Sequence, residues 1–467
     1  MLRTGETICA PATSGRGAIA VIRISGPECF DICKKIFFPF NNKTEIEKQK
    51  GYTVIYGEIR SENELIDDVL VSIFRAPHSY TGEDSAEISC HASPYIQQRI
   101  VELLIENGAV PASPGEFTQR AFFNGKIDLS QAEAVADLIA SESQAAHRIA
   151  VNQMRGMFSD EIRKLRADLV HFASLIELEL DFAEEDVEFA DRNELEAIVK
   201  RVLKTANDLA LSFSLGNAIK NGVPVVITGS PNTGKSTLLN TLLREEKAIV
   251  SEIPGTTRDA IEDTAIIEGV QFRFTDTAGL RETDDAIERL GIKKTREKIQ
   301  TAAIILLVID INNTTDQIKD TLDNVRGIIS GSDIKMMILI NKIDLASTVK
   351  REEIRKDVSL LQGESLSFIS ALTGEGIDIL KEELLRYADD TRKASDHVII
   401  TNIRHYHALL QVTDSLERVL QGLREGLQDD LLAIDIRQAI HYLGEITGEI
   451  TTDEILGNIF RNFCIGK

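Results

Sequence analysis

Cysteine is scarce in this sequence of 467 residues, which has five thiols, no Cys-x-x-Cys pair and no histidines clustered beside them. That scarcity excludes a disulfide scaffold and argues against a structural zinc site. Long apolar runs are missing too, because the longest, residues 302–309, is far shorter than the roughly 20 residues that a helix needs to cross a bilayer. The first residues lack the apolar core of a signal peptide, so we expect a cytoplasmic protein with reduced thiols.

Basic residues are the second shortage. The chain has 52 Lys and Arg against 74 Asp and Glu, which gives a formal net charge of −22 spread over its whole length. Because binding to a nucleic-acid backbone requires a positive surface, this balance argues against a freestanding nucleic-acid binder. It leaves open a local basic strip or a basic partner. The composition is otherwise 43% hydrophobic and 27% charged, as in a globular protein, and the length suggests roughly two to four domains.

Two segments show strand patterns. Residues 1–121 alternate strand-like runs, 18–24 and 67–74, with turns, which is typical of an α+β domain. Residues 216–383 alternate short apolar runs with helical stretches, which predicts a parallel, doubly wound α/β sheet. The expected strands of this sheet are residues 223–228, 272–275, 304–310, 336–340 and 366–370.

Two other segments, residues 122–215 and 384–467, show helical periodicity. Ser130 and Glu133 form a Ser-x-x-Glu pattern that predicts a capping box at the start of the first of them. The polar residues 389–391 are typical of a linker. Helical segments on both sides of an α/β unit predict a multidomain α/β and α+β protein, in which the α/β domain is inserted into a helical domain.

A glycine-rich loop follows the expected strand 223–228 and precedes a helical stretch. Its sequence is Gly-Ser-Pro-Asn-Thr-Gly-Lys-Ser, residues 229–236, the pattern of a P-loop. Backbone N–H groups of such a loop surround phosphates at the N-terminus of a helix. Lys235 would reach the β- and γ-phosphates as a catalytic residue, and Ser236 would bind Mg²⁺. The predicted nucleotide contacts here are Gly229, Asn232, Thr233, Gly234, Lys235, Ser236 and Thr237.

Two further motifs concern the γ-phosphate. Residues 255–259, Gly-Thr-Thr-Arg-Asp, place a threonine where a switch-I loop would bind Mg²⁺, and we assign Thr257 to the metal. Asp276 ends an expected strand and begins an Asp-x-x-Gly motif, in which the aspartate holds Mg²⁺ through water and the glycine N–H senses the γ-phosphate. The predicted contacts of these motifs are Ser251, Thr256, Thr257, Asp276, Thr277, Ala278 and Gly279.

The last two motifs select the base. Asn341, Lys342 and Asp344 belong to an Asn-Lys-x-Asp motif after another expected strand. A carboxylate at Asp344 accepts hydrogen bonds from N1–H and the exocyclic amine of guanine, whereas adenine offers no such donors there. Ser370 and Ala371 begin the loop that would close over the base. Five motifs in this order predict a domain that binds and hydrolyses GTP.

The residue that orients the attacking water is not evident. Ras-like switches carry a glutamine directly after Asp-x-x-Gly, and this chain has Leu280 there. Arg258 and Arg281 are candidate arginine fingers, or ordinary surface residues of the switch loops. Either the domain hydrolyses GTP poorly, or the stabilisation of transition-state charge comes from another source.

With these motifs, the whole chain resembles the MnmE (TrmE) family of tRNA modification GTPases. The resemblance also rests on residues 15–17 (Gly-Arg-Gly) and 23–26 (Arg-Ile-Ser-Gly), 80–84 (Tyr-Thr-Gly-Glu-Asp), 114–117 (Pro-Gly-Glu-Phe) and 463–467 (Phe-Cys-Ile-Gly-Lys). It implies a folate-binding and dimerising domain over residues 1–121, a helical domain over 122–215 and 384–467, and a GTPase domain over 216–383.

The resemblance also implies that a potassium ion takes the place of an arginine finger when two GTPase domains meet. The matching ligands of this ion are Asn232, Ser251, Ile253 and Thr256. An added cation would neutralise charge that develops between the β- and γ-phosphates. Glu288 matches the residue that orients the water, although by itself it reads as a solvated helix residue.

The resemblance further implies that 5-formyltetrahydrofolate binds to Arg23, Glu87, Lys126 and Lys467. Taken alone, Arg23 lies between Ile22 and Ile24, which point to the opposite face of a strand. Arg23 is then either a charge that requires a partner or an ordinary arginine of an edge strand, and Glu87 has the same ambiguity.

The cysteines divide into two kinds. Cys464 is either a nucleophile, with its pKa lowered by Arg461 or Lys467, or a small buried residue with an inert thiol. Cys29 and Cys33, one helical turn apart, are predicted to be packing residues.

The resemblance finally implies a homodimer, joined through its N-terminal domain, that acts with the flavoprotein MnmG on tRNA. Its product would carry an aminomethyl or carboxymethylaminomethyl group at C5 of the wobble uridine, with a one-carbon unit from the folate. One alternative is a GTP-dependent ribosome-assembly switch like Era or Der, which the single GTPase domain and the absence of a basic RNA-binding segment disfavour. Another is a folate-dependent one-carbon enzyme with a regulatory GTPase domain.

Overall fold

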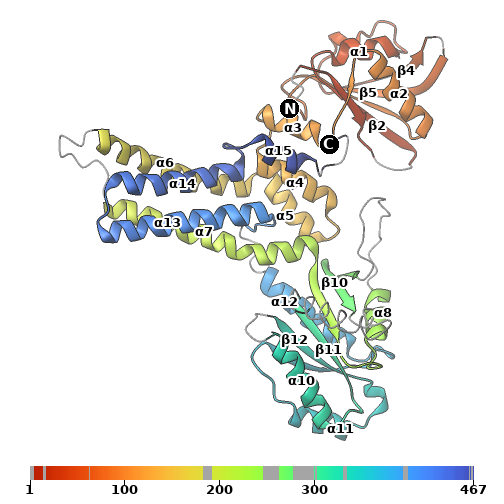
Figure 1. Cartoon of the computed structure of the whole chain (residues 1–467). Coiled ribbons are helices and arrows are strands. Elements are labelled where there is room, and N and C mark those ends of the chain that lie inside the picture. Colours follow the sequence, from red (N-terminus) through yellow and green to blue (C-terminus); the bar gives the residue numbers. More distant parts are fainter. Residues whose placement is uncertain are drawn as a thin grey trace, which may run out of the picture. The chain divides into compact units, whose positions relative to one another are not determined.

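A computed structural model describes residues 5–13, 17–62, 64–181, 192–245, 262–276, 299, 302–329, 334–392, 398–461, 463 and 466 (Figure 1). The chain forms two compact units. The first comprises Met1–Ile139, Asn152–Lys204 and Ala408–Lys467, and the second comprises Ala140–Val151 and Thr205–His407. Across the described ranges, every helix is too short or too polar to pass through a lipid bilayer.

The first unit begins with a seven-stranded sheet in the order β3-β4-β5-β6-β2-β1-β7. All neighbouring strands are antiparallel except β1 and β7. The strands are β1 Ile8–Pro11, β2 Ile19–Ser25, β3 Phe37–Pro39, β4 Thr53–Ser61, β5 Glu64–Phe74, β6 Ser85–His91 and β7 Val110–Pro111. The two predicted strands correspond to β2 and β5.

Helices α1 (Cys29–Ile36) and α2 (Pro94–Glu106) cover one face of this sheet. Alternate residues of the strands point into the core between them, because successive side chains of a strand lie on opposite faces. Ile22 and Ile24 of β2 are fully buried there, as predicted. Cys29 and Cys33 of α1 are buried in the same core, which confirms them as packing residues.

Eight further described helices include residues of the first unit. Seven of them are α3 Glu116–Phe123, α4 Leu129–Ala140, α5 Gln144–Met154, α6 Met157–Asp181, α13 Ile403–Glu425, α14 Asp429–Thr447 and α15 Asp453–Phe460. α7 (Arg192–Asn221) begins in this unit and ends in the second. Leu129 and Ala132 of α4 form a small core with Phe460 of α15 and Phe463.

The capping box begins at Asp128, two residues before the predicted position at Ser130. The N–H of Gln131 donates to Oδ1 of Asp128 at 2.9 Å, and the N–H of Asp128 donates to Oε1 of Gln131 at 2.9 Å. Ser130 instead lies inside α4, fully buried, where its Oγ accepts a hydrogen bond from Gln153 at 3.2 Å. The reciprocal cap is therefore Asp-x-x-Gln and not Ser-x-x-Glu.

The second unit contains the predicted doubly wound sheet, in the order β13-β12-β11-β8-β10-β9. The strands are β8 Val223–Thr228, β9 Glu262–Ile267, β10 Val270–Asp276, β11 Ile304–Asp310, β12 Lys335–Asn341 and β13 Glu364–Phe368. Five strands are parallel, and β9, which no pattern predicted, pairs antiparallel with β10. Alternate residues of β11 enter separate cores on the two faces of the sheet.

Within residues 223–392, which include this sheet, the described α-helices are α8 Lys235–Glu245, α10 Thr315–Ile329, α11 Thr348–Asp357 and α12 Ile377–Arg392. α12 continues through residues 389–391, so the predicted linker there is wrong. Leu380 and Leu384 are fully buried and anchor the helix to the sheet. A polar last turn can continue such a helix, because its backbone hydrogen bonds do not depend on apolar side chains.

Candidate functional site

The P-loop connects β8 to α8 at the carboxyl edge of the parallel sheet, where ligands bind in open α/β folds. Gly229 and Gly234 have φ angles of 146° and 96°, which side chains rarely adopt. A Cβ at Gly229 would also collide with the carbonyl oxygen of Val308, and one at Gly234 with the amide nitrogen of Asn341. Asn232 has a left-handed φ of 61°. The loop therefore requires glycine at both positions.

Lys235, 6% exposed, is folded over this loop. Its ammonium group donates to the carbonyl oxygens of Gly229 at 3.1 Å and Ser230 at 2.9 Å. Thr233 also donates to the oxygen of Ser230, at 2.9 Å. These contacts hold a positive charge beside the N-terminus of α8, a combination that binds phosphate.

A hydroxyl and a carboxylate meet next to the P-loop. Ser236 Oγ donates to Oδ2 of Asp276 at 3.0 Å, because Asp276 ends β10 beside the parallel strand β8. Both side chains offer hard oxygen donors of the kind that Mg²⁺ prefers. The residues present thus fit the predicted metal.

The base-selecting motifs lie at the same edge and are tied to the P-loop. The amide group of Asn341, 2% exposed, donates to the oxygen of Thr233 at 2.8 Å and accepts from the N–H of Ala371 at 2.9 Å. Ser370 Oγ donates to Oδ1 of Asp344 at 2.6 Å. The structure therefore brings together the P-loop, Asp276 and the two predicted base loops.

Asp310 is a residue of this site that the sequence analysis missed. Lys342 donates to Oδ2 of Asp310 and to the carbonyl oxygen of Asn232, both at 2.7 Å. Burial by itself raises the pKa of Asp310, but the hydrogen bonds from Lys342 and from the N–H of Asn312 outweigh it, and the pKa is lowered. The signal available in the sequence was its position at the end of β11, on the ligand-binding edge.

Several predicted residues lie outside the described ranges. They are Ser251, Ile253, Thr256, Thr257, Arg258, Thr277, Ala278, Gly279, Leu280, Arg281, Glu288, Cys464 and Lys467. The roles assigned to them in the switch loops, in potassium binding and at residues 463–467 remain predictions.

A second candidate site, the Arg23 site, lies on the sheet of the first unit. Arg23 of β2 is paired directly with Glu87 of β6, and its Nε and Nη2 donate to Oε1 of Glu87 at 3.0 and 2.8 Å. Its Nη1 donates to the oxygen of Gly466 at 3.3 Å. β2 lies between β6 and β1, so the interpretation of Arg23 as an arginine of an edge strand is wrong. Each charge is the partner that the other requires.

Two aromatic rings, which belong to motifs of the family resemblance but had no predicted role, flank Arg23. Its Cζ lies 5.2 Å from the ring centre of Tyr80 and 5.5 Å from that of Phe117, within the range of cation–π attraction. Burial raises the pKa of Tyr80, which is also hydrogen-bonded to Thr118 at 2.9 Å. Lys126 donates to the oxygen of Pro77 at 2.9 Å and so contacts the loop that carries Tyr80.

The four described cysteines are buried and do not form a reactive group. Burial raises the pKa of Cys9 to about 12 and that of Cys90 to about 11, and it also raises the pKa of Cys29. A thiol with a raised pKa carries little thiolate near neutral pH and is a poor nucleophile.

A doubly wound parallel sheet with a P-loop after its first strand and an Asn-Lys-x-Asp motif on the same edge defines a P-loop GTPase. Comparison with known families narrows this class. Residues 129–464 match the model described as the MnmE helical domain, and residues 7–126 match that described as the GTP-binding protein TrmE N-terminus. The chain belongs to the MnmE family.

Curated relatives resemble this chain over nearly its whole length. It is 50% identical over 464 residues to the tRNA modification GTPase MnmE of Bacteroides thetaiotaomicron, with 99% of each chain covered. The protein of the same name from Bacteroides fragilis is 52% identical over 465 residues, and that from Flavobacterium psychrophilum 51% over 467 residues, again with 99% of each chain covered.

Gly234→Ala is expected to weaken nucleotide binding. The added Cβ meets Asn341, and the positive φ alone costs about 1–3 kcal/mol, which corresponds to roughly a 5- to 150-fold loss of affinity. Titration with a fluorescent GDP analogue measures the effect. Gly327→Ala is the matched control, because Gly327 lies in α10 with open space around its Cβ position. Equal affinity of the two variants would contradict the assignment of the loop.

Proposed function

We propose that this chain is a cytoplasmic, potassium-activated GTPase that modifies tRNA together with the flavoprotein MnmG. The reaction adds an aminomethyl or carboxymethylaminomethyl group at C5 of the wobble uridine of certain tRNAs. The observation that carries this proposal is the match over 99% of the chain to proteins named tRNA modification GTPase MnmE, because it covers the GTPase site and the Arg23 site together.

GTP occupies the P-loop with its phosphates against Lys235 and the N-terminus of α8. Ser236 and Thr257 bind Mg²⁺, and Asp276 holds it through water. The metal neutralises charge on the β- and γ-phosphate oxygens. Asp344 accepts the two donors of guanine, and the hydrogen bond from Ser370 supports this role because it fixes the orientation of the carboxylate.

Potassium replaces an arginine finger, with Asn232, Ser251, Ile253 and Thr256 as its ligands, and Glu288 orients the attacking water. Support within the described residues comes from Asn232. Its left-handed backbone is fixed by the bond from Lys342 to its carbonyl oxygen, and Asp310 in turn holds Lys342. A ligand on a fixed backbone loses little freedom when the ion binds.

Replacing potassium with sodium is expected to lower the rate of GTP hydrolysis at least about tenfold, because the analogous arginine finger contributes 10³- to 10⁵-fold. Asn232→Ala should lose the potassium stimulation, as measured by phosphate release at increasing KCl and constant ionic strength. Asn324→Ala is the control, since Asn324 is exposed on α10. Rates that do not distinguish the two cations would exclude the role given to Asn232.

The Arg23 site binds 5-formyltetrahydrofolate, which supplies the one-carbon unit, with Arg23, Glu87, Lys126 and Lys467 as the binding residues. Its chemistry supports this ligand. Arg23 and Glu87 present a donor and an acceptor side by side for the polar edge of a pterin, and Tyr80, 37% exposed, offers a flat ring for stacking.

Homodimerisation through the N-terminal domain is supported by the face of the sheet opposite α1 and α2. Tyr56 of β4 pairs with Leu70 of β5, and their side chains are 54% and 46% exposed. The strand register continues through β6 to β2 and places Arg23 on this same face. Val54 and Ile19 extend the apolar surface and are more than 60% exposed. An exposed apolar face of this kind marks a protein interface.

Tyr56→Glu is expected to convert the dimer to a monomer, because the added charge would have to be buried between two apolar faces. Sedimentation velocity over a range of concentrations measures the dimer affinity, which should fall at least about tenfold. Tyr95→Glu serves as the control, since Tyr95 is 59% exposed on α2, on the other side of the sheet. A dimer that tolerates Tyr56→Glu would place the interface elsewhere.

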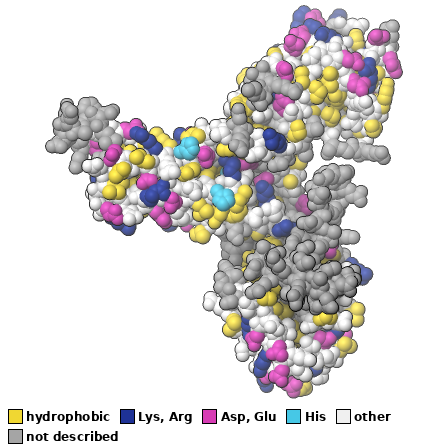
Figure 2. All heavy atoms as spheres, in the orientation of Figure 1, with side chains coloured by type: hydrophobic (Ala, Val, Ile, Leu, Met, Phe, Trp, Pro, Cys, Tyr) yellow, Lys and Arg dark blue, Asp and Glu magenta, His cyan; other side chains and the backbone are white. Residues whose placement is uncertain are grey.

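Because this chain has a net charge of −22, we assign most contacts with tRNA phosphates to the partner, MnmG. On the face drawn in Figure 2, the Lys and Arg side chains that are coloured are interspersed with Asp and Glu and do not form a continuous basic strip. Since backbone binding depends on clustered positive charge, MnmG supplies most of the affinity for tRNA in this proposal.

Nucleoside analysis of tRNA tests the whole proposal. Cells that lack this chain should contain wobble uridines without the C5 group, and the wild-type gene should restore it. Lys235→Ala should fail to restore it, whereas Lys350→Ala, on the GTPase domain helix α11, should succeed. Normal wobble uridines in the deletion strain would rule out the proposed function and leave a ribosome-assembly switch as the alternative.

A further inference from the structure

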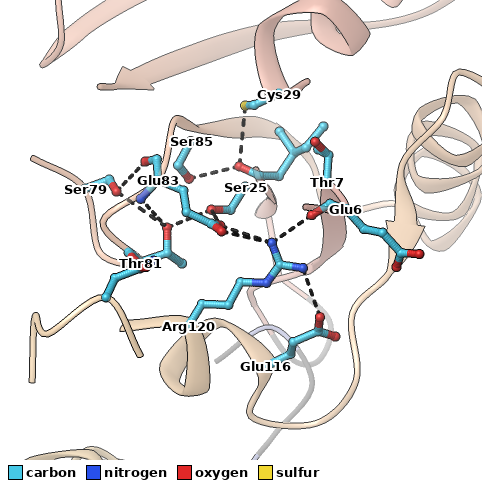
Figure 3. A network of polar contacts seen from close by, with 12 residues as sticks. Glu6, Thr7, Ser25, Cys29, Ser79, Thr81, Glu83, Ser85, Glu116 and Arg120 are labelled. Carbon is cyan, nitrogen blue, oxygen red and sulfur yellow. Dashed lines mark hydrogen bonds and ion pairs between the residues drawn. The ribbon is translucent and has the colours of Figure 1, made fainter. Parts of the chain in front are cut away.

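Arg120, on helix α3, carries a charge that is almost fully buried, with 2% of the residue exposed. Its Nη1 donates to both oxygens of Glu83, at 3.2 and 3.1 Å, and to the backbone oxygen of Glu6 at 2.8 Å. Its Nη2 donates to Oε1 of Glu116 at 3.1 Å. Figure 3 shows the guanidinium group enclosed by these three partners.

The contacts extend to strand β2, which carries Arg23. Ser25, two residues after Arg23, donates to Oε2 of Glu83 at 2.9 Å and is hydrogen-bonded to Thr81 at 2.7 Å. Glu83 and Thr81 belong to the loop of residues 75–84 between β5 and β6. Glu83 of the 75–84 loop thus accepts hydrogen bonds both from Arg120 of α3 and from Ser25 of β2, and so links the three elements (Figure 3).

The two rings beside Arg23 come from the elements that Arg120 joins. Tyr80 directly precedes Thr81 in the 75–84 loop, and Phe117 directly follows Glu116 in α3. Each ring is therefore one residue away from a side chain of the network. A displacement of the loop relative to α3 would change the position of Tyr80 over Arg23.

We propose that Arg120 is a positioning residue of the Arg23 site. It holds the 75–84 loop against α3 and β2, so that Tyr80 and Phe117 keep their places around the guanidinium group of Arg23. The identity of the ligand, a reduced folate, rests on the proposed function, whereas the positioning of Tyr80 does not.

Stability alone does not account for this arrangement. A buried ion pair loses most of its attraction to the cost of removing the charges from water, and an apolar side chain of similar volume often packs equally well. An apolar side chain cannot, however, bind Glu83 of the 75–84 loop, the backbone of Glu6 and Glu116 of α3 by directional hydrogen bonds. A guanidinium group can, because its donors have a fixed planar geometry.

The test uses the full chain labelled with 3-fluorotyrosine, and the resonance of Tyr80 is assigned as the one that Tyr80→Phe removes. Arg120→Met should shift this ¹⁹F resonance and weaken binding of 5-formyltetrahydrofolate at least about tenfold, because small displacements of a binding group have large effects. Glu83→Gln keeps the shape of the side chain but removes its charge. It should have a smaller effect in the same direction, and it decides the matter if Arg120→Met does not fold.

Arg99→Met is the matched control, because Arg99 also pairs with two carboxylates, Glu102 and Glu106, but lies on α2 on the opposite face of the sheet. It should leave the Tyr80 resonance and the folate affinity unchanged. A Tyr80 resonance that is the same in Arg120→Met, Glu83→Gln and wild type overturns the positioning role. If the wild type does not bind the folate, the proposed ligand is wrong, and the ¹⁹F resonance still decides whether Arg120 positions Tyr80.

Discussion

The GTPase domain depends on one buried amide, the side chain of Asn341. It donates to the P-loop at Thr233 and accepts from the loop at Ala371, so it joins three loops that are far apart in the sequence. Its position explains the absence of a side chain at Gly234, because the amide occupies the space that a Cβ would need. Buried backbone groups must be paired, and here one side chain pairs two of them. The phosphate and base subsites are consequently fixed relative to each other.

The Arg23 site uses the same principle with charges. Arg23 and Glu87 are direct neighbours on two interior strands, and Arg120 is a second guanidinium group held among oxygen acceptors. Both guanidinium groups contact residues far away in the chain. The geometry of this site therefore comes from tertiary pairing and not from a local loop like the P-loop.

This difference explains what could be predicted from the sequence. The nucleotide site could be predicted from the sequence because its residues lie in contiguous motifs directly after strands. Parallel strands bring their carboxyl ends together at one edge of the sheet. The sequence left open whether Arg23 needs a partner or is an ordinary arginine of an edge strand, and only the pairing of β2 with β6 decides between the two. The roles of Asp310 and Arg120 could not be predicted, because the partners that place them in their sites are distant in the sequence. These partners are Lys342, 32 residues from Asp310, and Glu83 and Glu6, 37 and 114 residues from Arg120.

Errors in the element boundaries have a similar cause. Ser130-x-x-Glu133 and Asp128-x-x-Gln131 are both acceptable capping patterns, and only the burial of Ser130 against Gln153 decides between them. Likewise, the polar residues at 389–391 resemble a linker until the buried residues Leu380 and Leu384 show that the helix is anchored to the sheet. Burial of this kind depends on which segments meet in the fold.

The hydrogen bond from Arg23 to the oxygen of Gly466 links residues 443 positions apart. At the usual speed of protein synthesis, roughly 5–20 residues per second, the second residue appears about 20 to 90 seconds after the first. During that interval the strands that pair around Arg23 are already synthesised, but its hydrogen bond to Gly466 cannot form. A nascent or prematurely terminated chain therefore lacks the contact between Arg23 and Gly466, and this contact can form only when synthesis has passed the last helices.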